Sequence, residues 1–326
     1  MSAFADPEII RMATVDFIPV AGDDWYQRRR QDAEGKFFRA VADSLGKTGA
    51  GDSSRQGIYL FAADGTPLGY KNAGGHPVVM REVLRDALRD FARLPATKRT
   101  PGAVKIGDPG PVDPAYDHTP PPGGLVLKVY TRILDFHNGA YVKGTCEAKG
   151  GDKAARDHVW ITADEVQQLA PAKPVVGFRY PLPEKVADRI ARFHLIDITR
   201  GEPPAWGKTE VRAKRFTLRV VSATPEAVEL RLDGEALMAT AGDVSTAERG
   251  FDARVVGDLR YLPGKKTFDR FNVVAVGTHW GNFPHTEDAR PGKSLVGISF
   301  ELATDQSNER IPPQGIRNPD IYFGRD

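Results

Sequence analysis

A stretch rich in proline and glycine, from Pro95 to Gly124, most constrains what this chain can fold into. Eight of its 30 residues are proline and five are glycine. Because proline fixes one backbone angle and lacks an N–H donor, the stretch favours an extended, semi-rigid spacer without a helix or a central strand. The chain has 326 residues, about twice the usual length of one domain. We therefore expect a domain at 1–95, a linker at 96–124 and a second domain at 125–326.

Composition narrows the classes of function. The apolar fraction of 40% is ordinary for a folded protein, and 45 basic against 43 acidic residues leave a formal charge of +2. That balance argues against a nucleic-acid partner. The single cysteine, Cys146, excludes an internal disulfide and a cysteine-rich zinc site. The partner expected is a protein or a small-molecule ligand.

The sequence also bears on membranes and location. No apolar run approaches the roughly 20 residues that a membrane-spanning helix needs, so no membrane insertion is expected. The opening residues, MSAFADPEIIRMATVDF, lack the basic end, apolar middle and cleavage site of a secretion signal. A cytoplasmic location is expected for the chain as given. The alternative is a true start upstream of Met1, which would allow a periplasmic or exported protein.

Residues 1–95 follow an α/β pattern. Capping residues, apolar periodicity and the turn at Asp64-Gly65 indicate the elements. The expected order is a helix at 6–15, a strand at 16–20, a helix at 33–45, strands at 57–61 and 66–70, and a helix from Pro77.

This order resembles a thioredoxin fold. Residues 57–70 and the Pro77 helix are similar to the closing hairpin and last helix of thioredoxin-like proteins, and the opening ADPEIIRMATVDFIPVAGDD is similar to the segment after their active-site turn. The family's Cys-x-x-Cys is missing, because no cysteine precedes Cys146, and its usual cis-proline is missing near Arg55-Gln56-Gly57. Met1 also begins where the family's first strand and cysteine turn would already have passed. The resemblance therefore implies a redox-inactive or incomplete thioredoxin-like domain.

Residues 125–326 are mostly β, and we expect an α+β domain dominated by an antiparallel sheet with helices on one face. Helices are expected from the capping box at Thr162–Glu165 and at 184–195. The expected strands are 125–136, 156–161, 216–221, 228–232, 251–262, 268–278 and 295–303.

The segment from Gly277 to His285 is the strongest candidate for a site. After a long apolar strand it places His279 and His285 on an expected loop, together with Trp280 and Phe283. Imidazole and nearby carboxylates suit a divalent metal or a small ligand. His279 and His285 are therefore the candidate metal ligands. Trp280 and Phe283 are candidate ligand contacts, with the alternative that they plug the end of a sheet.

Three other residues could carry chemistry. His158, beside Asp157, and His194, near Asp197, could form an acid/base pair or contact a ligand, with buried or surface histidines as the alternative. Cys146, between two lysines, is a possible reactive thiol, with a small core residue as the alternative. Neither a phosphate-binding loop, a dinucleotide fingerprint nor Gly-x-Ser-x-Gly occurs.

Because the common catalytic motifs fail, the first hypothesis is a non-catalytic binding or adaptor protein of two domains. The alternative is an enzyme, such as a metal-assisted hydrolase, with its site on the histidine and aromatic loop. A second alternative is a thiol-redox protein whose N-terminus is truncated in this sequence. Catalytic residues are not assigned.

Overall fold

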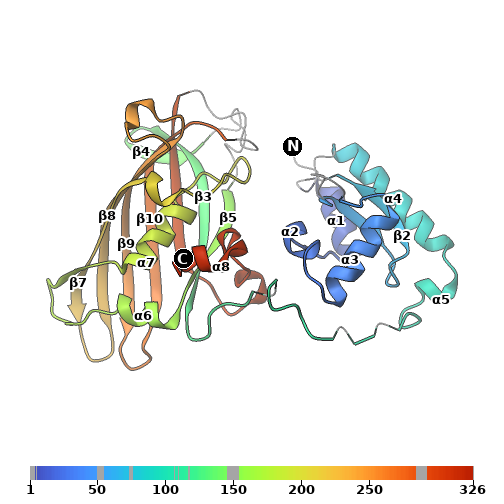
Figure 1. The fold of residues 1–326 in the computed structure, drawn as a ribbon, viewed down its shortest axis with the longest axis horizontal. Coiled ribbons are helices and arrows are strands. Elements are labelled where there is room, and N and C mark those ends of the chain that lie inside the picture. The colour runs from blue at the N-terminus through green and yellow to red at the C-terminus, as the bar shows by residue number, and fades with distance from the viewer. Residues whose placement is uncertain are drawn as a thin grey trace. The chain divides into compact units, whose positions relative to one another are not determined.

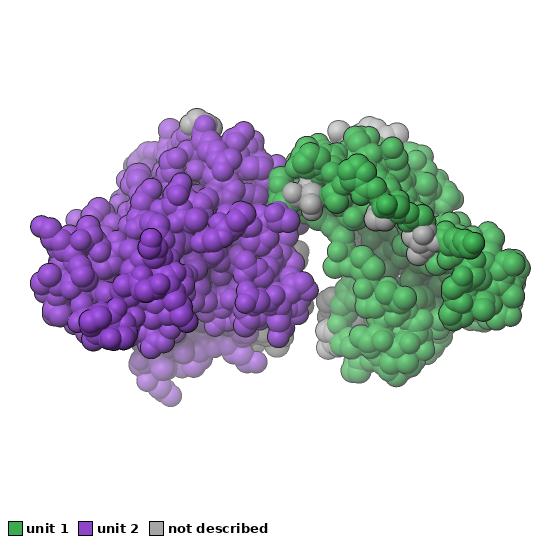
Figure 2. Space-filling model, turned by 90° about the horizontal axis from the view of Figure 1, so that it is seen from below, with its two compact units in different colours: residues 1–118 green, residues 119–326 purple. Residues whose placement is uncertain are grey.

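A computed structural model gives the fold and describes residues 4, 6–49, 55–72, 76–105, 107–108, 110–116, 118–144, 154–283 and 292–325. The chain divides into two compact units (Figure 2). Unit 1 is Met1–His118 and unit 2 is Thr119–Asp326. Each is described by itself.

Unit 1 is a small helical unit built around one β-hairpin (Figure 1). Its elements are α1 (Pro7–Val15), α2 (Asp24–Gln27), α3 (Ala33–Ser44), β1 (Ile58–Phe61), β2 (Pro67–Lys71), α4 (Pro77–Arg93) and α5 (Ala96–Arg99). Asp6 caps α1, because its carboxylate accepts the N–H groups of Glu8 and Ile9. Apolar side chains from α1, β1 and α4 form the core of this unit, including Ile9, Leu60 and Leu84.

Two expectations for unit 1 are wrong. Residues 16–20 do not form a strand, and Ile18 and Val20 are 93% and 86% exposed. The described sheet of unit 1 contains only β1 and β2, so these apolar residues have no neighbouring strand to pair with. The proline-rich stretch also contains a helix, α5. The helix forms because Pro95 lies before its first turn and the next four residues contain neither proline nor glycine.

Unit 2 contains one large antiparallel sheet, as the sequence predicted. Its strands are β3 (Leu125–His137), β4 (Ala140–Lys143), β5 (Ala154–Ile161), β6 (Arg179–Pro181), β7 (Val211–Ala223), β8 (Val228–Ala239), β9 (Gly250–Leu262), β10 (Thr267–Trp280) and β11 (Lys293–Leu302). The order is β4-β3-β11-β10-β9-β8-β7-β6, and β5 also pairs with β3. Sequence reasoning missed the short strands β4 and β6.

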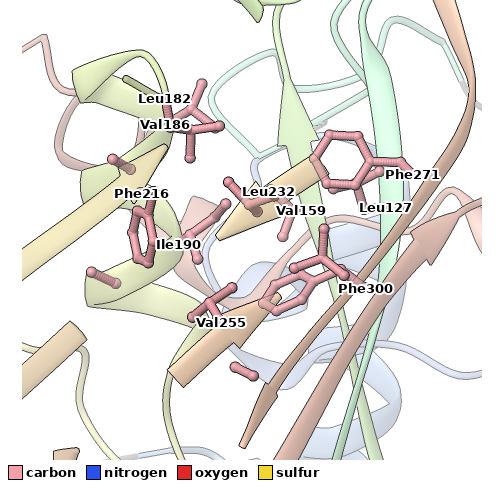
Figure 3. Packing of buried hydrophobic residues seen from close by; sticks show 14 of the residues in the cluster. Leu127, Val159, Leu182, Val186, Ile190, Phe216, Leu232, Val255, Phe271 and Phe300 are labelled. Carbon is pink, nitrogen blue, oxygen red and sulfur yellow. The ribbon is translucent and has the colours of Figure 1, made fainter. Parts of the chain in front are cut away.

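The two faces of this sheet differ in chemistry. Alternate residues of the long strands are buried, so one face is apolar and faces the core (Figure 3). The other face carries ion pairs between neighbouring strands, such as Arg231 with Asp258 and Lys128 with Glu301. This division explains why period-two alternation located the long strands in the sequence.

Helices cover the apolar face (Figure 1). They are α6 (Ala163–Leu169), which has the expected capping box, and α7 (Glu184–Arg189), which continues as a π-helical turn (Ile190–His194). Val186 and Ile190 pack against strand residues such as Phe216 and Val255 (Figure 3). The short helix α8 (Pro319–Tyr322) follows near the end of the chain and was not predicted. No helix in the described ranges is long and apolar enough to span a membrane.

Candidate functional site

His279 and Trp280 lie on a strand, whereas the sequence indicated a loop. They are the last two residues of β10 and pair with β11 through Ser294 and Lys293. The sequence placed the end of this strand at Thr278, two residues too early. Gly277 lies within the strand at a close approach to β9, where a Cβ would be 2.1 Å from the carbonyl oxygen of Asp252.

A small pocket lies beside His279. Its lining comes from four segments of unit 2, and its free space of about 10 Å³ is room for about one water molecule. The lining residues are Ile133, Asp197, Arg200, His279, Trp280, Gly281, Gly292 and Ser294. Asp197, Arg200 and His279 are each less than a tenth exposed, so the pocket is polar and poorly solvated.

Asp197 and Arg200 form a buried ion pair at this pocket. Arg200 Nε donates to Asp197 Oδ2 at 2.9 Å, while Thr199 donates to Asp197 Oδ1 through its N–H and hydroxyl, at 2.9 and 2.6 Å. Burial raises the pKa of Asp197, but the bonds from Thr199 and the charges of His279 and Arg200 bring it below its usual value. Asp197 is therefore a carboxylate with both oxygens engaged. Arg200 also donates to Asn282 Oδ1 at 3.0 Å.

The imidazole of His279 is the group of the pocket that can form a hydrogen bond with a ligand. The side chain of His279 is 5% exposed and lines the free space, and the described hydrogen bonds do not include its ring nitrogens. Burial, aided by the charges of Arg200 and Arg249 and opposed by Asp197, lowers the pKa of His279 to about 4. At neutral pH the ring is uncharged, with one donor and one acceptor to offer.

Trp280 and Arg249 support this end of the sheet. Trp280 Nε1 donates to the carbonyl of Ala247 at 2.9 Å, and its ring lies against Gly250, where a Cβ would be 2.0 Å from it. Arg249 lies over the ring of Trp206 at 3.8 Å and donates to the carbonyl of Pro204 at 3.0 Å. The ring of Trp280 thus both lines the pocket and closes the end of the sheet.

The other two candidate histidines lie elsewhere, and neither lines this pocket. His194 Nε2 is 3.0 Å from Tyr322 Oη, and its Nδ1 is 3.2 Å from Asp157 Oδ2, although out of line for a hydrogen bond. The structure therefore brings His194 to Asp157, not to Asp197. Both His194 and Tyr322 are almost completely buried. Asp157, His194 and Tyr322 are too buried for a substrate to reach them. Their contacts instead hold α8 against β5.

The remaining candidates are placed as follows. His158 lies on β5 and is completely buried. Phe283 follows β10 and is 42% exposed. His285 and Cys146 lie outside the described residues. The described residues contain no group of three or more histidine, cysteine or carboxylate side chains placed to hold a metal, so the metal site at His279 and His285 stays a prediction.

Sequence reasoning missed Arg200 and Ser294. Ser294 was set aside because it lies in no Gly-x-Ser-x-Gly and because Gly292-Lys293-Ser294 lacks the first glycine of a phosphate-binding loop. The useful signal would have been the pairing of β10 with β11, which a single sequence does not give. The sequence matches no protein-family model, and searches of characterised proteins and of solved structures returned no match. The function is therefore argued from the residues of this chain.

Proposed function

We propose that this chain is a non-catalytic binding protein whose small-molecule site is the His279 pocket of unit 2. The observation that carries the proposal is the neutral imidazole of His279, which lines a poorly solvated pocket beside the Asp197–Arg200 ion pair. A ligand group that hydrogen-bonds to this imidazole would gain more there than in open water. The space of about 10 Å³ suits one hydroxyl, amino or carbonyl group of the ligand.

The state of Asp197 supports binding over catalysis. A histidine that acts as a general base is usually held in one tautomer by a carboxylate. Here both oxygens of Asp197 are taken by Thr199 and Arg200, and no ion pair joins Asp197 to His279 among the described contacts. His279 therefore lacks the group that would orient it for proton transfer.

Unit 1 is proposed as the second module, a thioredoxin-like domain without redox activity. In the order of its elements, the hairpin β1–β2 is followed by α4, as the resemblance implies. No cysteine occurs in residues 1–118, so the unit itself cannot perform thiol exchange. Its role would be contact with another protein.

A fragment screen tests the ligand site. We expect small polar fragments, screened by ligand-observed NMR against the full chain, to include binders that the variant His279→Ala weakens about tenfold or more. The reason is that one lost hydrogen bond in a poorly solvated pocket is worth roughly 1.5 kcal/mol. His137→Ala, at the exposed end of β3, is the matched control and should leave the same fragments bound. Hits that bind His279→Ala as tightly as the original chain would refute the site.

A second candidate function rests on Ser294. Ser294 lies directly opposite His279 in the register of β10 and β11, and Asp197 lines the same pocket, so a nucleophile, a base and a carboxylate are close together. The candidate activity is hydrolysis of an ester. If this is the function, a fluorophosphonate probe labels Ser294, and labelling is lost in Ser294→Ala and in His279→Ala. If binding is the function, Ser294 stays unlabelled at any probe concentration that spares Ser299.

A further inference from the structure

The last described residues of unit 2 form a strap over β5. We call residues 303–325 the C-terminal strap. Arg156 on β5 donates to the carbonyl of Asn308, the N–H of Gln314 donates to Asp157 at 3.0 Å, and the N–H of Trp160 donates to Tyr322 Oη at 3.3 Å. The strap therefore contacts β5 along most of its length. These contacts cover a strand that pairs with only one neighbour, β3.

His158 lies on β5 between Arg156 and Trp160, which contact the strap, and opposite Lys128, which donates to Glu309 of the strap. Its side chain is 0% exposed, and neither ring nitrogen has a hydrogen-bond partner among the described residues. The indole N–H of Trp160, two residues further along β5, is also buried without a partner. Buried polar groups without hydrogen bonds raise the free energy of the closed strap. If the strap moved away, water could form hydrogen bonds with these groups.

The charged groups around His158 do not offset the cost of burying its protonated form, although Asp157 and Glu309 favour that form. Arg156 and Asp157 flank it on β5, and Lys128 is its partner residue on β3. His194 on the π-helical turn and Glu309 on the strap also act on it electrostatically. Asp157 already accepts from Gln314, and Glu309 accepts from Lys128 and from the N–H of Thr304. Both carboxylates are therefore engaged by other donors.

We propose that His158 is an acid-sensitive latch, whose protonation releases the C-terminal strap from β5 while the sheet stays folded. Release can be local because the strap adds no strand to the sheet, although it must break the hydrogen bond from Arg189 on α7 to the carbonyl of Tyr322. Its two most buried apolar residues, Ile316 and Tyr322, are not members of the main core cluster of unit 2. Opening would give the imidazolium access to water and expose Trp160.

The electrostatics give the size of the effect. Burial, with the charge of Arg156, lowers the pKa of His158 to about 4 when the strap is closed. In an open strap the ring returns toward its usual pKa of about 6.5. Between pH 7 and pH 4.5 protonation therefore favours the open strap by about 50- to 100-fold.

Hydrogen exchange of the full chain, followed by mass spectrometry and corrected for the intrinsic rate at each pH, tests the latch. We expect peptides from residues 303–325 to lose protection by about 50- to 100-fold between pH 7 and pH 4.5. Peptides from β9 also lose protection, because folding opposes protonation of His158 and His279, but they stay more strongly protected than the strap at both pH values. His158→Leu, which cannot titrate, should keep the strap protected at pH 4.5. His158→Gln is the second variant if His158→Leu fails to fold, and His137→Asn is the control that should behave as the original chain.

Two results would overturn the latch. The first is an equal loss of protection for the strap in His158→Leu, His158→Gln and the original chain, which would assign the acid response to another group. The second is equal protection of the strap and β9 at pH 4.5, which would mean that the strap exchanges only when the unit unfolds as a whole.

Discussion

Replacing Arg189 by methionine is expected to lower the free energy of unfolding of unit 2 by about 3–5 kcal/mol. Arg189 is completely buried and donates to both oxygens of Glu165, at 2.6 and 2.8 Å. It also donates to the carbonyls of Trp160 and Tyr322, each at 3.0 Å. Burial raises the pKa of Glu165, but the bonds from Arg189 bring it below its usual value. The variant would leave this carboxylate buried without its counter-ion.

The measurement is urea unfolding of the full chain in a Trp25→Phe background, which leaves only the tryptophans of unit 2. Arg215→Met is the matched control, because Arg215 pairs with Glu235 on the exposed face of the sheet, where such pairs contribute about 0–1 kcal/mol. Adding Glu165→Gln to Arg189→Met should recover part of the loss, since no buried charge then remains. Equal effects of Arg189→Met and Arg215→Met would contradict the assignment.

The second large effect expected is on the pH dependence of stability through His279. Its pKa is about 4 in the folded chain against about 6.5 when unfolded, so the unfolded chain binds more protons between these values. The contribution of His279 to the free energy of unfolding is therefore fully present above about pH 6.5, and it is lost as the pH is lowered toward 4. The shift of roughly 2.5 units corresponds to about 3 kcal/mol.

Unfolding free energies measured at intervals from pH 7.5 to pH 4 test this expectation. In His279→Gln the decline over this range should be shallower by about 3 kcal/mol, because glutamine does not titrate. His137→Gln, at an exposed position, should show the same decline as the original chain. A decline in His279→Gln as steep as in the original chain would show that protonation of His279 is not opposed by folding.

Local signals predicted the long strands of unit 2 and α6, but not which strands are neighbours in the sheet. Alternation located β9 and β10 almost to the residue, since one face of each is buried and the other carries charge. The capping box from Thr162 to Glu165 located α6 for a similar reason, because both hydrogen bonds form within four residues. Such signals depend only on residues close together in the chain.

The candidate site depends on contacts between distant residues. His279 and Trp280 were identified, but Asp197 was assigned to His194, and Ser294 was not connected with His279. Pairing of β10 with β11 and the turn that carries Asp197 and Arg200 bring these residues to one pocket. In unit 1, residues 16–20 have the composition of a strand but form none, because no described strand lies beside them. Composition does not show whether a neighbouring strand is present.

The position of β3 in the sheet has a consequence for how fast unit 2 can fold. β3 is the first strand of the unit in the sequence, yet it pairs with β11, the last. Leu127 lies opposite Leu302, so closing this pair requires a loop of most of the unit. Domains dominated by such distant pairings fold slowly, on the order of milliseconds to seconds. During synthesis the apolar residues of β3 leave the ribosome long before β11 exists, and this interval is when a chaperone would bind them.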